Sequence, residues 1–119
     1  MAVKTTTIYG GRRTVIYVMD IFTETDIDPD TALKLMKKNP MKLFNEIKKD
    51  IRKTLGDWAD VKVASKYLEK DSGLVEYIVR SNFGEVSVKV IVGEDPVKIL
   101  REFYEYEAMR IDMTRNTLK

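Results

Sequence analysis

The side chains of this chain that can take part in acid–base, nucleophilic or metal chemistry are carboxylates, amines and hydroxyls. Its 119 residues include no cysteine and no histidine. Disulfides, cysteine–histidine zinc sites, serine–histidine catalysis and histidine pH switches are therefore excluded. Basic residues number 21 and acidic residues 19, so the net charge of +2 does not by itself indicate a nucleic-acid or membrane partner. Any function must come from local clusters.

A carboxylate and a lysine with catalytic spacing stand at the start of an expected strand, in Asp60-Val61-Lys62. This carboxylate-x-lysine spacing resembles part of the site of metal-dependent nucleases, in which carboxylates hold the metal that activates water. Asp57 or Asp20 is a candidate further ligand. Because three such residues occur together by chance in many chains, an exposed strand end is the favoured interpretation, and the nuclease is an alternative.

Two other groups are also better explained without catalysis. Five carboxylates lie within eleven residues: Asp20, Glu24, Asp26, Asp28 and Asp30. They lack EF-hand spacing, and Asp28 and Asp30 suit a helix cap and a first-turn charge. Tyr104 and Tyr106 lie beside carboxylates, but tyrosine nickases also hold a metal through a histidine pair. We therefore expect no catalytic residue, cofactor or metal, and favour a non-enzymatic protein.

A basic segment runs from residue 30 to residue 53, with eight basic against three acidic residues and a local charge of +5. Lysines on one helix side can neutralise phosphates without reading bases, and two arginines beside Gly10-Gly11 would extend that ridge. The candidate nucleic-acid contacts are Arg12, Arg13, Lys34, Lys37, Lys38, Lys42, Lys49 and Lys53. An ordinary solvated lysine-rich surface is the alternative. Trp58 is a core or lid residue unless its exposure allows base stacking.

The expected helix over residues 96–113 carries two apolar stripes on roughly opposite sides. One contains Val97, Leu100, Tyr104, Ala108 and Ile111. The other contains Ile99, Phe103, Tyr106 and Met113. A surface helix needs only one apolar side, so we assign the second stripe to an interface between two copies in a homodimer. The alternative is that the helix at 29–38 covers it within one chain.

The elements that position these groups follow from turn, cap and periodicity signals. Gly10-Gly11 predicts a hairpin between strands at 3–9 and 12–22, the second of them covered on both faces. Proline after Asp or Asn predicts helix starts at residues 29, 40 and 96, giving helices over 29–38, 40–55 and 96–113. Further strands are expected at 60–68, 74–80 and 85–92.

Alternation fixes the expected pairing of the last three strands. Keeping all valines on one face places Arg80 opposite Glu85 and Glu76 opposite Lys89, and a five-residue loop places Lys66 opposite Glu76. The chain is thus expected to form a single α+β domain over residues 1–119. It would have an antiparallel sheet of about five strands, in the order ββ-αα-βββ-α, with the helices packed on one face.

Composition adds expectations about source and location. Missing cysteine and abundant Lys, Glu, Ile and Val suggest heat adaptation, as in a hyperthermophile, archaeal or otherwise, or a virus of one. No apolar run is long enough to span a membrane and no signal-peptide core is visible, so a cytoplasmic protein (host cytoplasm if viral) is expected.

The favoured function is a small, homodimeric accessory protein that binds DNA or RNA non-specifically. A structural or protein–protein interaction module using the last helix is the alternative.

Overall fold

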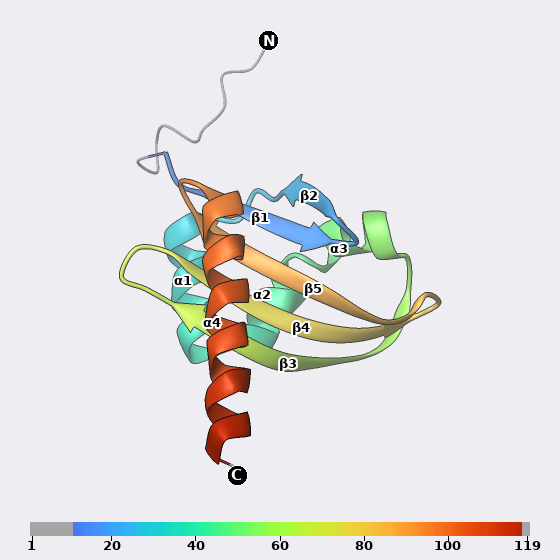
Figure 1. Ribbon diagram of the computed structural model, residues 1–119. Coiled ribbons are helices and arrows are strands. Elements are labelled where there is room, and N and C mark those ends of the chain that lie inside the picture. Colours follow the sequence, from blue (N-terminus) through green and yellow to red (C-terminus); the bar gives the residue numbers. More distant parts are fainter. Residues whose placement is uncertain (1–10, 118–119) are drawn as a thin grey trace.

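We describe the protein from a computed structural model that places residues 11–117, with side chains described through residue 111 (Figure 1). This part of the chain confirms the α+β class. Its elements are β1 (Arg13–Val18), β2 (Ile21–Glu24), α1 (Pro29–Lys38), α2 (Pro40–Glu46), α3 (Lys48–Leu55), β3 (Trp58–Leu68), β4 (Gly73–Ser81), β5 (Gly84–Gly93) and α4 (Pro96–Thr117).

The strands form one antiparallel sheet in the order β2-β1-β5-β4-β3. β1 has a neighbour on each side, as its two apolar faces predicted. Its hairpin partner is β2, because Met19 and Asp20 take positive φ angles of 48° and 65°. Two such residues in succession make the turn that two-residue hairpins prefer. The expected strand at 3–9 lies outside the described residues.

The helix starts use the predicted caps. The carboxylates of Asp28 and Asp95 accept hydrogen bonds from the amides of Asp30 and Lys98, and the Asn39 side chain accepts one from Lys42. The expected helix at 40–55 is instead two helices. The chain leaves helical geometry at Ile47, whose amide donates to the carbonyl of Phe44, three residues back. This tighter turn separates α2 from α3.

Helices cover both faces of the sheet, which corrects the expectation that all of them pack on one. α1, α2 and α3 cover one face and bury the even-numbered valines of β5 together with Val75, Tyr77 and Val79. α4 covers part of the other face through Ile99, Leu100 and Phe103 (Figure 1). The physical reason is that β1, β4 and β5 are apolar on both faces: Val15, Leu74 and Ile91 need a cover of their own.

The predicted pairing of β4 with β5 is confirmed, with Arg80 opposite Glu85 and Glu76 opposite Lys89. The predicted pairing of β3 with β4 is wrong by one residue: Lys66 lies opposite Val75, not Glu76. An irregularity between Val63 and Ser65 shifts the register. Because side chains alternate between faces, this shift moves Lys66 to the face covered by α1.

Tyr77 links the sheet to the helical layer, and its burial predicts a pH effect. The side chain is fully buried, its hydroxyl donates to the carbonyl of Pro40 at 2.7 Å, and burial raises its pKa. A raised folded-state pKa means that the unfolded chain loses this proton first. The free energy of unfolding should therefore fall as pH rises above about 10, the ordinary tyrosine pKa.

Urea unfolding at pH 7 to 11 measures this dependence. Tyr77→Phe should lose about 1 kcal/mol at neutral pH, where the hydrogen bond is intact, and should show a weaker alkaline decline. Tyr104→Phe, at a half-exposed position, leaves Tyr77 in place and is the matched control, so the alkaline decline should persist in this variant. An unchanged alkaline decline in Tyr77→Phe would contradict the assignment.

Candidate functional site

Five of the predicted nucleic-acid contacts project from the layer formed by α1, α2 and α3. They are Lys34, Lys37, Lys38, Lys42 and Lys49. We call them the lysine surface. The apolar residues of α1 to α3 are buried against the sheet, which leaves these lysines exposed. Among the described residues, no carboxylate lies within ion-pair distance of any of the five. Lys53, by contrast, pairs with Asp50 at 3.4 Å.

The two predicted arginine contacts do not extend the lysine surface. Arg12 pairs with Asp30 at the start of α1. Its guanidinium also donates to the carbonyl of Asp71. Arg13 pairs with Glu24 of β2 at 2.9 Å. By strand alternation Arg13 lies on the same face as Val15, the face that α4 covers, and so on the opposite side from the lysines.

Two further lysines adjoin the lysine surface. Lys48, exposed at the start of α3, was counted in the basic segment but not among the contacts. Lys66 of β3 donates to the carbonyl of Lys37 at 3.4 Å and so joins the end of α1. The expected register had placed Lys66 on the other face of the sheet. No signal in the sequence marks the irregularity that moves it.

Trp58 is half-buried at the start of β3 and packs against the helical layer. Its ring meets that of Phe44 edge-on, with 5.3 Å between centroids. The guanidinium of Arg52 lies 4.9 Å from the centroid of the Trp58 ring and also pairs with Asp57. Arg52 thus covers the Trp58 ring. Trp58 packs within the structure, as expected for a core or lid residue, and is not free to stack on a base.

The residues predicted for an interface between chains divide between two environments. Ile99 and Phe103 are buried against the sheet of their own chain, with 6% and 2% exposure. They are therefore core residues, covered by β1, β4 and β5 and not by the helix at 29–38. Tyr106 is 42% exposed and its ring contacts that of Tyr67. The side chain of Met113 lies outside the described residues.

The other stripe of α4 is largely exposed. Val97, Tyr104 and Ile111 have exposed fractions of 50%, 49% and 54%, and Ala108 is also exposed. Leu100, which we placed in this stripe, is buried beside Phe103. The stripe that we assigned to a dimer interface therefore supplies core residues, and the stripe left for the chain's own core is largely exposed.

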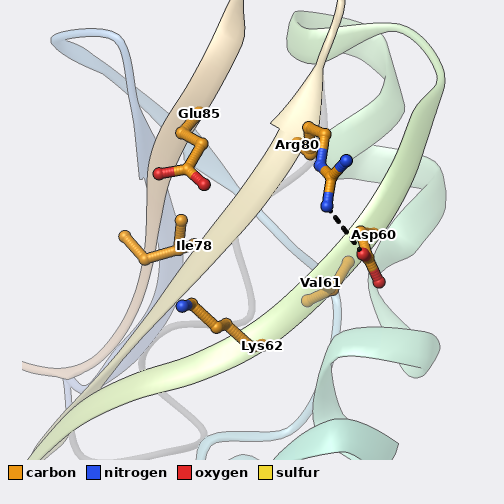
Figure 2. Close-up of a pocket in the computed structure, with 6 residues that line it drawn as sticks. All are labelled: Asp60, Val61, Lys62, Ile78, Arg80 and Glu85. Atoms are coloured by element: carbon orange, nitrogen blue, oxygen red, sulfur yellow. Dashed lines mark hydrogen bonds and ion pairs between the residues drawn. The ribbon is translucent and has the colours of Figure 1, made fainter.

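Part of the sheet face beside α4 is not covered by that helix and carries the nuclease-like residues (Figure 2). Asp60, Lys62, Ile78, Arg80 and Glu85 line a surface pocket there. Asp60 pairs with Arg80 at 3.2 Å, and Figure 2 shows the two side chains turned toward each other. Within the described residues no group of three or more acidic side chains is arranged to hold a metal ion.

A buried polar cluster lies between this pocket and α4. The Lys89 ammonium donates to the Ser87 hydroxyl at 2.8 Å and lies 3.6 Å from the Glu76 carboxylate, to which Ser87 also donates. The rings of Tyr17 and Tyr104 lie within 6 Å of the same ammonium. The Lys89 side chain is only 7% exposed, so the charge is compensated inside the structure and is not offered to a ligand.

The carboxylates between residues 20 and 30 have separate structural roles. Asp28 caps α1, while Glu24 and Asp30 pair with arginines. Asp20 accepts a hydrogen bond from the Tyr17 hydroxyl, and this bond raises the pKa of Tyr17. These contacts account for most of the run without a metal.

No family model matches this chain, and neither the curated proteins nor the solved structures contain a significant match. Among the described helices, none has the length and apolar character needed to cross a membrane. The lysine surface and the exposed side of α4 are thus the features from which function is argued.

Proposed function

We propose that this chain is a non-enzymatic accessory protein that binds nucleic acid non-specifically through the lysine surface. The observation that carries the proposal is the gathering of five exposed lysines on one helical layer without carboxylate partners. Elsewhere in the described chain many basic side chains are paired, including Arg12, Arg13, Arg52 and Arg80.

Uncompensated lysines suit a polyanion because their ammonium groups keep their full charge for an external partner. Binding would release the counterions condensed on the phosphates, which supplies most of the free energy of non-specific association. Lysine is a flexible point charge without the planar fork of arginine, and it suits backbone contact more than base readout. We therefore expect little sequence preference.

Charge-removing variants measure the contribution of the lysine surface. In fluorescence anisotropy with labelled duplex DNA and RNA of mixed sequence, Lys34→Gln/Lys38→Gln should weaken binding at low salt by about tenfold or more. Removing two phosphate contacts should also lower the salt slope by about 2. Both lysines are exposed on one side of α1, so the fold should tolerate the change.

Lys70→Gln/Lys98→Gln is the matched control. It removes the same charge from exposed positions that are not part of the lysine surface, one in the loop before β4 and one on α4, and should change affinity far less. Equal losses in the two variants would show that net charge alone governs binding. No loss in the α1 variant would contradict the proposed site.

A further inference from the structure

The face of the sheet beside α4 has room for a second helix. α4 crosses the strands near one end, over Val15, Leu74 and Ile91 (Figure 1). β4 has nine residues and therefore spans about 30 Å, whereas one helix covers about 10 Å of a sheet. The part that α4 leaves uncovered, which we call the open half, contains the pocket of Figure 2 and no covering element among the described residues.

α4 borders this open half with an apolar seam, which we define as Val97, Tyr104, Ala108 and Ile111. Intervals of seven, four and three residues are those of a helix that packs along a second helix. Tyr104 places the seam on the side of the open half, since its ring lies over Lys89 and it shares a surface pocket with Tyr17 and Phe83.

The floor and rim of the open half are also apolar in part. Tyr17 and Phe22 pack ring to ring with centroids 4.6 Å apart, and Phe22 is 41% exposed. Met19 and Phe83, at the ends of neighbouring strands, are 41% and 64% exposed. Exposed apolar residues that continue from a helix side onto a sheet face typically mark an interface.

We propose that the occupant is a second copy of this chain, whose α4 lies beside the first on the open half of the sheet. The twofold axis runs parallel to α4, between the two helices. Each α4 then covers the open half of the partner's sheet, the two seams meet, and two sheets enclose the helix pair. This packing is isologous, because the same surface serves both copies.

Charge complementarity favours a second copy over an unrelated partner. Lys98, Arg101 and Glu105 lie on the side of α4 that points away from its own sheet, and all three are exposed. α4 runs from the β1 side of the sheet past β3 (Figure 1). A twofold axis parallel to α4 keeps each residue level with the same strands in the partner.

The charges then meet in opposite pairs. Lys98 and Arg101, in the first turns of α4, would lie over the β1 and β5 level of the partner's sheet, where Asp20 and Glu85 border the open half. Glu105, further along, would lie over the β4 and β3 level, where the cations are Arg80 and Lys62. Such an arrangement selects this partner and this direction.

Engineered cysteines provide a direct test, since the chain has none of its own. Symmetry places Ala108 opposite its own copy in the seam, so Ala108→Cys should form a disulfide-linked dimer under mild oxidation. Asn82→Cys, on the exposed turn between β4 and β5, is the control and should stay largely monomeric on non-reducing gels. Light scattering of the wild type should give the mass of two chains.

Tyr104→Glu should convert the dimer to a monomer with an unchanged circular dichroism spectrum, because Tyr104 is half-exposed and outside the core. A monomeric wild type would overturn the proposal. So would a dimer that tolerates Tyr104→Glu, or Ala108→Cys chains that fail to cross-link while the control does. The outcome is independent of nucleic-acid binding, which belongs to the opposite face.

Discussion

Phe103→Ala is expected to lower the free energy of unfolding by about 3–5 kcal/mol, the usual cost of emptying a buried phenylalanine site. Phe103 is 2% exposed and packs with Ile99 and Leu100 against the sheet, so its removal leaves a cavity within one chain. Phe83→Ala removes the same side chain from a turn where it is 64% exposed. In the single chain it should cost less than about 0.5 kcal/mol.

Urea unfolding followed by circular dichroism measures both changes. Each variant should be compared at several protein concentrations, because a residue buried between chains gives a loss that depends on concentration. A loss for Phe103→Ala below about 1 kcal/mol would contradict its place in the core. Phe103 would then be assigned to the interface between two chains that helical periodicity predicted.

Glu76→Ala is the second change with a large expected effect. It leaves the Lys89 ammonium buried without its carboxylate, and breaking a buried pair in this way typically costs about 3–5 kcal/mol. Glu76 is itself 18% exposed in its side chain, which places the expected loss at the lower end of that range. Glu76→Leu/Lys89→Met removes both charges, keeps their volume and should recover much of the loss.

The exposed Asp60–Arg80 pair on the same sheet is the control for this measurement. Its side chains are 69% and 64% exposed, so Asp60→Ala should cost at most about 1 kcal/mol. Thermal and urea unfolding of these three variants and the wild type measure the losses. Equal losses in Glu76→Ala and Asp60→Ala would show that Lys89 does not depend on its buried partner.

Side-chain alternation predicted the centre of the sheet correctly, because burial constrains it strongly. The alternate valines of β5 share a face with Val75, Tyr77 and Val79 only when the two strands pair in a register of the right parity, and the observed register has this parity. The pairing of β3 was missed by one residue because β3 is an edge strand whose outer face is polar. Its alternation therefore restrains the register weakly, and the irregularity near Val63 carries no side-chain signal.

The periodicity of α4 revealed two apolar stripes but not which of them faces the sheet. That choice depends on which sheet face the helix reaches, a property of the whole topology. The sequence did contain a signal for the second sheet face, because apolar residues alternate with the main core residues at Val15, Leu74 and Ile91. These residues need a second covering element. The lysines were predictable as exposed residues, whereas the partners of Arg12 and Arg13 arise from contacts between distant segments.

The measurement that tests the proposed function most directly is the salt dependence of binding between the wild-type protein and duplex DNA. Five neutralised phosphates would give a plot of log affinity against log salt concentration with a slope of roughly −4 to −5. The same slope should appear with unrelated sequences of equal length. No binding at low salt, or binding whose affinity does not change with salt, would contradict a nucleic-acid role for the lysine surface.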